Sequence, residues 1–237
     1  MWPDLRERRR EPEWMDDPSL PAAQHDVALR GLARLNRCAR SHAILWTRLM
    51  MLARTANHAG RPLHVLDVAT GSGDLPLAMA HRARGLGLDI RWSVCDVSAH
   101  ALDVAKDRAE QAGFAFAAHR LDATADELPT TDVSICSLFV HHLDQPQVVG
   151  VLRGMKQAST MALGVADLDR SRLGYLLAWI ASRALTRSPV VHVDALLSVR
   201  AGFRPVDVMR MAMDAGLDGA TLDRAWPARW RLWWTAP

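Results

Sequence analysis

The chain has 237 residues, of which 49% are hydrophobic and 23% charged, which is enough for one domain with a full core. Its formal net charge of +3 is too small to predict a nucleic-acid partner. Cys38, Cys95 and Cys136 lie far apart without a Cys-x-x-Cys spacing, so we expect neither a disulfide nor a metal site. No secretory signal and no run of about 18 apolar residues is present, so we expect a cytoplasmic protein without stable membrane insertion.

The first 60 residues contain an arginine-rich start followed by two helical patterns. Residues 1–20 combine several arginines with prolines and are predicted to form a flexible arm. Over residues 21–60, apolar side chains recur at helical spacing, for example at Leu29 and Leu32. The pattern predicts two amphipathic helices ahead of the first strand, within a single domain that spans residues 21–237.

After Pro62 the pattern changes to short apolar runs that alternate with helical segments. The expected strands are LHVLDVA, DIRWSVCD, FAFAAHR, DVSICSL and TMALGVADL. The expected helices cover residues 74–84, 98–112 and 145–157. Strands separated by helices of this length predict a parallel sheet covered on both faces, a Rossmann-like doubly wound α/β core over residues 63–167.

The first expected strand runs into a glycine turn, DVATGSGD, at residues 67–74. Gly71 and Gly73 allow a tight turn and let a ligand approach the backbone closely. A dinucleotide site needs a third glycine, but Pro76 stands at that position, which disfavours a pyrophosphate. Asp67 and Asp74 would also repel phosphate, and they suit a ligand with an ammonium group or hydroxyls.

Two further acidic residues follow the second and third expected strands. Asp96 lies 23 residues beyond Gly73, at a position where a carboxylate can accept hydrogen bonds from both ribose hydroxyls. Asp122 can accept from an exocyclic amine while the Ala123 N–H donates to an adenine ring nitrogen. These residues therefore predict binding of ribose and adenine without phosphate.

The four segments VLDVATGSGD, CDVSAHAL, LDATADELP and TDVSICSLFVHHL together resemble the class I S-adenosylmethionine-dependent methyltransferases. More narrowly, VLDVATGSGDLPLA resembles the branch that includes ubiquinone/menaquinone-biosynthesis methyltransferases and methyltransferases of phenolic or polyketide-derived small molecules. The resemblance covers residues 62–167 well. It implies a seven-stranded sheet whose last strand is antiparallel, with N-terminal helices, a helical lid insertion and S-adenosyl-L-methionine as cofactor.

Under this resemblance, the residues expected to bind the cofactor belong to the glycine turn and to the ends of the next three strands. They are Asp67, Ala69, Gly71, Ser72, Gly73, Asp74, Asp96, Val97, Asp122, Ala123 and Ser137. We expect a small-molecule acceptor, apolar and either aromatic or phenolic, and a protein that is a monomer or a homodimer.

Residues 168–204 lie outside the regular alternation of strands and helices and are predicted to form the lid over the acceptor. An apolar helix at 172–185 would be followed by a polar linker containing Pro189. The apolar side chains of this helix would either line the acceptor pocket or pack into the core.

A phenol must lose a proton, because its pKa is about 10, and a histidine can accept that proton. His142, after the fourth expected strand, and His192, in the lid, are the first candidates, with His141 behind them. For each of the three, a structural role as a hydrogen-bonded histidine is the alternative.

Three other functions compete with this interpretation. The chain could bind S-adenosylmethionine without transferring a methyl group, or it could methylate carbon in a quinone precursor. A nicotinamide oxidoreductase is the third, and it would bind NAD. A nucleic-acid base methyltransferase is disfavoured, because the turn after the fourth expected strand reads SLFVHH rather than Asn/Asp-Pro-Pro-aromatic.

Overall fold

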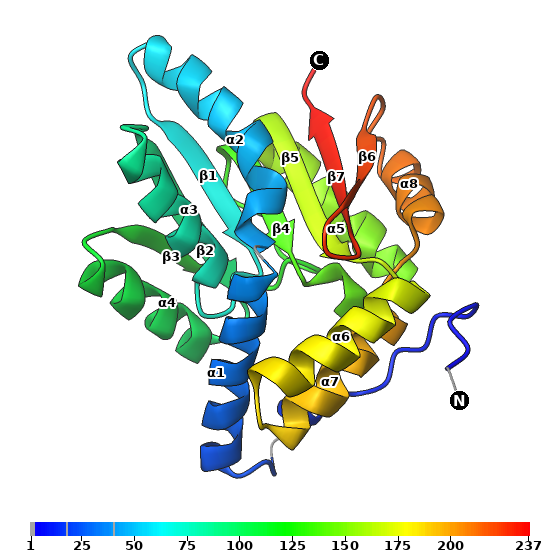
Figure 1. Ribbon diagram of the computed structural model, residues 1–237. Helices are drawn as coiled ribbons and strands as arrows, with labels where there is room; N and C mark the ends of the chain where they lie inside the picture. The colour runs from blue at the N-terminus through cyan, green and yellow to red at the C-terminus, as the bar shows by residue number, and fades with distance from the viewer. Residues whose placement is uncertain (1–2, 18, 40) are drawn as a thin grey trace.

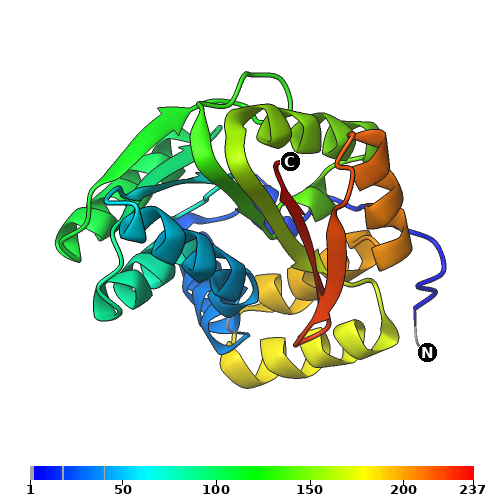
Figure 2. The same cartoon turned by 90° about the horizontal axis from the view of Figure 1, so that it is seen from above.

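The computed structural model describes residues 3–17, 19–39 and 41–237 and contains one seven-stranded sheet between layers of helices (Figures 1 and 2). The strand order is β3-β2-β1-β4-β5-β7-β6. Strands β1 to β5 are parallel, whereas β7 is antiparallel to both β5 and β6. The predicted doubly wound α/β sheet with an antiparallel last strand is confirmed.

The strands lie where the apolar runs predicted them. Their bounds are β1 Leu63–Val68, β2 Ile90–Asp96, β3 Phe116–Arg120, β4 Thr131–Ser137, β5 Ser159–Leu168, β6 Thr221–Ala225 and β7 Arg229–Thr235. The order reverses between β1 and β4, and this switch point is where ligands bind in sheets of this kind, outside the carboxyl ends of the strands.

The helices also follow the sequence pattern closely. Their bounds are α1 Ala22–Cys38, α2 Ser41–His58, α3 Asp74–Gly85, α4 Ala99–Gln111, α5 Gln145–Ala158, α6 Arg172–Leu185, α7 Pro189–Ala201 and α8 Pro205–Asp214. Two short 3-10 helices, η1 at Trp14–Asp16 and η2 at Val140–His142, complete the described elements. None of the helices formed by the described residues is both long and apolar enough to span a bilayer.

Alternate residues of the central strands feed two separate cores. On β1, Val65 packs into the core beneath α2, α3 and α4, whereas Leu66 and Val68 pack into the core beneath α5 and α8. This alternation follows from the period of two in a strand, and it explains why the central strands are apolar on both faces. The two cores hold the carboxyl ends of β1, β2 and β4 in fixed register.

The C-terminal hairpin closes the second edge of the sheet with tryptophan side chains. Trp230, Trp233 and Trp234 are buried, and the Trp230 indole N–H donates to the Leu168 carbonyl at 3.0 Å. Trp226, at the end of the same hairpin, remains 74% exposed. Three of the four tryptophans therefore act in packing.

The predicted polar linker after α6 is wrong, because residues 189–201 form the helix α7. Ser188 caps this helix by accepting from the Val191 N–H, and Pro189 occupies its first turn. Proline is tolerated there because that N–H has no partner within a helix, so Pro189 begins the helix instead of breaking it.

The alternative that the α6 apolar side chains pack into the core is wrong for four of them, whereas their lining of the acceptor pocket stays a prediction. Leu173, Leu176, Trp179 and Ile180 are exposed and do not belong to the core. Helix α6 packs against α7 and α1 with its other side (Figure 2).

The described part of the N-terminal arm, residues 3–17, contacts the end of the sheet and α7. Arg8 donates to the carbonyls of His141, Leu143 and Ala201. The backbone N–H groups of Trp14 and Met15 both donate to the buried Asp194 carboxylate, at 2.8 and 3.0 Å. The arm thus runs behind α7 in the view of Figure 1, and its Arg8 reaches η2.

Candidate cofactor and acceptor site

The glycine turn after β1 leads directly into α3. Ala69, Gly71 and Gly73 all have left-handed backbone, with φ of 55°, 54° and 72°. A Cβ at Gly73 would lie 2.9 Å from the Cβ of Ala105, so glycine is required there by helix packing. A Cβ at Gly71 would have no protein atom within 4 Å, which leaves that side of the turn open to a ligand.

Asp67 supports the turn from beneath. Its carboxyl group is buried and accepts a hydrogen bond from the Thr70 hydroxyl at 2.7 Å. Burial raises the pKa of Asp67 to about 7, against the opposing effect of the Thr70 hydrogen bond, and nearby Asp96 raises it further. A ligand cation at this turn would favour the ionised carboxylate.

Asp96 ends β2 and faces the same turn. Its Oδ2 accepts from the Gly71 N–H and its Oδ1 from the Ser98 N–H, both at 2.9 Å. Each carboxylate oxygen has a second lone pair, so both can still accept from a pair of vicinal hydroxyls. The hydrogen bond to Gly71 therefore joins the two segments that the sequence assigns to one ligand.

Asp74 is already paired. It lies 2.6 Å from the Arg108 guanidinium of α4, and the same guanidinium donates to the Ser72 carbonyl at 2.8 Å. The Ser72 hydroxyl also donates to Asp74 at 3.1 Å. Arg108 therefore fixes the outer side of the glycine turn and partly neutralises the charge that the sequence analysis assigned to a ligand.

The remaining predicted cofactor residues lie at the ends of β2, β3 and β4. The Asp122 carboxylate accepts from the backbone N–H and the hydroxyl of Thr124, and these bonds lower the pKa of Asp122. Ala123 packs at the margin of the second core, whereas Val97 is exposed. The Ser137 hydroxyl is buried, and no hydrogen-bond partner for it is found among the described residues, which makes it a polar atom that a ligand can satisfy.

A second cluster lies at the ends of β4 and β5, where His141 pairs with Asp167. His141 Nδ1 donates to an Asp167 oxygen at 2.7 Å, and its backbone N–H donates to the other at 3.2 Å. Burial alone would lower the pKa of His141, but the attraction and hydrogen bond of Asp167 raise it above its usual value. Burial acts to raise the pKa of Asp167, yet His141 holds it below its usual range. The pair resembles the oriented histidine of a catalytic dyad.

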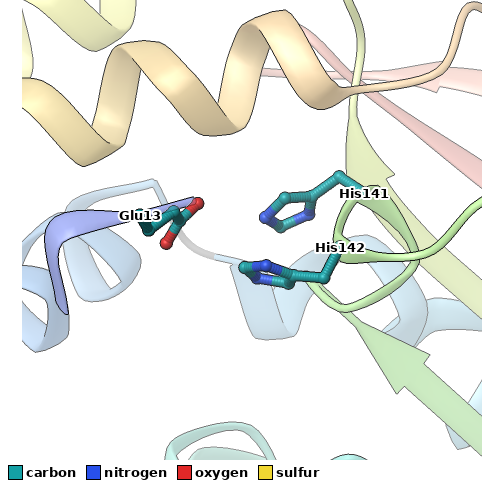
Figure 3. Close-up of side chains that lie close together, drawn as sticks. All are labelled: Glu13, His141 and His142. Atoms are coloured by element: carbon teal, nitrogen blue, oxygen red, sulfur yellow. The ribbon is translucent and has the colours of Figure 1, made fainter. Parts of the chain in front are cut away.

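His142 and Glu13 face the same histidine (Figure 3). The ring centroids of His141 and His142 are 4.1 Å apart. One potential metal-ligating atom from each of Glu13, His141 and His142 lies within 4.8 Å of the other two. Partial desolvation and the charge of His141 lower the pKa of His142 to about 4. His142 is therefore neutral at pH 7 and a weak base.

Several guanidinium groups surround this histidine pair. Arg8 donates to the His141 carbonyl at 2.7 Å and Arg10 to the His142 carbonyl at 2.8 Å. Arg229 is buried nearby and acts electrostatically on His141. The residue types of the cluster would suit a metal ion, but this positive surrounding disfavours a divalent cation and favours an acceptor that develops negative charge.

His192 lies on α7, away from this pair. Its Nε2 donates to the Thr186 carbonyl at 2.9 Å, so the ring closes the turn between α6 and α7. The carboxylate of Asp194, two residues further along α7, accepts hydrogen bonds from the N-terminal arm.

Sequence reasoning missed Arg108 and Glu13 and did not connect Asp167 with His141. Arg108 and Glu13 lie on a helix and an arm whose packing no local pattern reveals. Asp167 could have been found, because it ends β5 beside β4, and the carboxyl ends of neighbouring parallel strands meet at one edge.

The chain matches known methyltransferases in sequence and in fold. A sequence model of the family described as "Methyltransferase domain" matches residues 65–160. The ubiquinone/menaquinone biosynthesis C-methyltransferase UbiE of Rickettsia felis is 38% identical over 71 residues, which cover 30% of this chain and 29% of that protein.

Three solved structures illustrate the likeness in fold. The S-adenosylmethionine-dependent methyltransferase SibL has a TM-score of 0.65 at 21% identity, over 93% of this chain and 60% of that one. The plantazolicin methyltransferase BamL has a TM-score of 0.61 at 14% identity, over 87% and 90%. Magnesium protoporphyrin IX methyltransferase from Synechocystis, with bound S-adenosylhomocysteine, has a TM-score of 0.55 at 14% identity, over 93% and 90%.

Residues 65–160 thus match a methyltransferase domain, and the fold of the chain is the fold of solved methyltransferases of the S-adenosylmethionine-dependent class. The cofactor of this class is S-adenosyl-L-methionine, and neighbouring structures hold it or its product.

A valine at Gly71 tests whether the open side of the glycine turn receives the cofactor. We expect Gly71→Val to weaken S-adenosylhomocysteine binding by at least about tenfold, because its side chain would occupy that space. Gly87→Val is the matched control, since Gly87 also has positive φ and open space but lies in the turn after α3. Equal affinities of the two variants, measured by calorimetry, would remove Gly71 from the site.

Proposed function

We propose that the protein transfers the methyl group of S-adenosylmethionine to a small, apolar acceptor that is aromatic or phenolic. The observation that carries this proposal is the His141–Asp167 pair, which stands at the same edge of the sheet as the glycine turn and Asp96. A proton acceptor beside a methyl-donor site is what O-methylation of a phenol needs.

The cofactor fits the residues that the structure brings together. Asp96 would accept from the ribose hydroxyls, and the turn at Gly71 would receive the amino-acid end, where Asp67 would favour an ammonium group. Asp122 and Ala123 would contact the adenine, with Ser137 supplying a further polar atom. When bound, the cofactor supplies an electrophilic methyl carbon on a sulfonium.

The acceptor end depends on His141. The phenolic proton would pass to its Nε2, since its Nδ1 is held by Asp167. The acceptor oxygen would then bond to the methyl carbon that the cofactor supplies, and the sulfur would keep the bonding pair. The products are a methyl ether and S-adenosylhomocysteine. Arg8, Arg10 and Arg229 add positive potential that favours the phenolate.

C-methylation of a quinone precursor is the second candidate, because the matched segment of UbiE belongs to a C-methyltransferase. The match spans 71 residues, which are 29% of that protein. We also propose a cytoplasmic location, which the buried free thiols of Cys95 and Cys136 support, and a monomeric or homodimeric state without nucleic acid.

A labelled-methyl assay tests the proposal. Protein is mixed with methyl-labelled S-adenosylmethionine and a panel of phenols, alkylated phenols and hydroquinones, and the products are analysed by mass spectrometry. We expect methyl ethers from at least one phenol. Products methylated at carbon would favour the second candidate, and cofactor binding without product across the panel would favour a protein that binds the cofactor only.

A further inference from the structure

Helix α6 presents a continuous apolar strip to solvent. Leu173, Leu176, Trp179 and Ile180 are 52%, 37%, 46% and 47% exposed. Residues three, four and seven apart share one face of a helix, so these side chains lie together on the side of α6 turned away from α7. Exposure of several large apolar side chains on one helix face marks an interaction surface.

Arginine side chains frame this strip. Arg172 and Arg183 lie on the same face of α6, and Arg187 follows its end, all three exposed. The Arg183 guanidinium stacks over the Trp179 ring, 4.8 Å from its centroid. No aspartate or glutamate occurs in residues 170–193. The strip and these arginines together are called the α6 face below.

A polar pocket adjoins the first turn of α6. It has a volume of about 440 Å³, and its lining includes Arg6, Arg170, Arg172 and Arg204, with Asp4 as the acidic member. Arg172 belongs both to this pocket and to the α6 face. Arg170 already donates to three backbone carbonyls and pairs with Asp207. The donors for a phosphate group would therefore come from Arg6, Arg172 and Arg204.

We propose that the α6 face docks the protein on the surface of an anionic phospholipid bilayer. Leucine, isoleucine and tryptophan would enter the boundary between headgroups and acyl chains, while the arginines contact phosphates. Such binding is peripheral and needs no spanning helix.

The positive charge of the α6 face favours a lipid surface over a second copy of the chain as its partner. In a symmetric dimer through this face, Arg172, Arg183 and Arg187 would approach the same residues of the partner without an acidic counterpart on α6. An anionic bilayer offers the opposite charge to all three at once.

The position of the α6 face relative to the site favours an acceptor that dissolves in the membrane, an inference that rests on the proposed function. Helix α6 packs on α7, and α7 contacts both the arm and η2, which carries His141 and His142. Docking through the α6 face would bring the acceptor end of the site close to the membrane, where an apolar phenol or quinone precursor dissolves.

Vesicle co-sedimentation tests the docking directly. We expect the protein to bind vesicles of phosphatidylglycerol and phosphatidylcholine at least tenfold more tightly than vesicles of phosphatidylcholine alone, and to be released by high salt. The double variant Leu176→Glu/Ile180→Glu should lose at least tenfold in affinity for the mixed vesicles. The matched control is Val206→Glu/Met213→Glu on α8, whose two positions are 62% and 67% exposed, and it should bind much as the unaltered protein does.

Three results would overturn the proposal. The first is absence of binding to the mixed vesicles, including the case in which inorganic phosphate alone binds the arginine-lined pocket. The second is equal loss of binding in the α6 and α8 variants. The third is a concentration-dependent dimer, seen by analytical ultracentrifugation, that the α6 variant abolishes. Methylation of a water-soluble phenol by the unaltered protein without vesicles separates failure of docking from failure of the proposed function.

Discussion

Replacing Asp96 with alanine is expected to weaken binding of S-adenosylhomocysteine by about 100-fold, or about 3 kcal/mol, because two ribose hydroxyls lose a charged acceptor. The loss should extend to the glycine turn, since the Gly71 N–H also loses its partner in Asp96. Calorimetric titration measures this affinity directly. The unfolding temperature should change much less, because Asp96 is only half-buried and makes no ion pair among the described residues.

The control for Asp96→Ala is Asp107→Ala, which removes the same charge from the exposed surface of α4. Asp107→Ala should bind S-adenosylhomocysteine like the unaltered protein. Asp96→Asn retains one acceptor oxygen and should fall between the two. Unchanged affinity in Asp96→Ala would show that the ribose binds elsewhere.

Replacing His141 with glutamine is expected to lower kcat by about 100-fold, the usual contribution of a general base. Cofactor affinity should stay within about twofold, since His141 lies at the acceptor end. His192→Ala is the control, because the His192 ring donates to the Thr186 carbonyl in the turn between α6 and α7, away from His141. Steady-state kinetics with an accepted phenol measure both effects, and a kcat that His141→Gln leaves intact would contradict the assignment.

The pH profile gives an independent readout of the same pair. A base must be deprotonated, so activity should rise as pH increases through the raised pKa of His141. Asp167→Asn removes the carboxylate that raises the pKa of His141. The rising limb of the profile should therefore move to lower pH, with a lower maximum rate. A rising limb that does not move would show that another group titrates.

The same pKa shift has a consequence for stability. Because the pKa of His141 is higher in the folded state than its ordinary value of about 6.5, its contribution is fully present below that pH. The contribution is lost as pH rises through the folded-state pKa. Thermal unfolding of Asp167→Asn should therefore lack this part of the decline between neutral and alkaline pH.

Much of the fold was predictable, because burial on both faces of the sheet leaves a clear signal. Apolar runs such as LHVLDV and the helical spacing of 172–185 correspond to β1 and α6 almost residue for residue. Helix α7 was missed for a local reason: Pro189 is typical of both a linker and a helix start, and the capping bond of Ser188 decides between them only in three dimensions.

The candidate site was likewise predictable from the sequence only in part. The proposed cofactor residues follow single strands in sequence, so Gly71 and Asp96 could be assigned to one place from the sequence. In the structure the Gly71 N–H donates to Asp96 at 2.9 Å. The proposed acceptor end depends on contacts between distant segments, such as His141 with Asp167 and the arm with α7. For that reason the sequence favours His142 and His192 over His141, whereas the structure gives His141 a carboxylate partner in Asp167.

Calorimetric titration with S-adenosylhomocysteine and, separately, with NAD tests the central claim most directly. The geometry of the glycine turn, with Asp96 bonded to Gly71 and Pro76 in place of a third glycine, predicts saturable binding of S-adenosylhomocysteine and no binding of NAD. Binding of NAD without binding of S-adenosylhomocysteine would contradict the assignment of this site to methyl transfer.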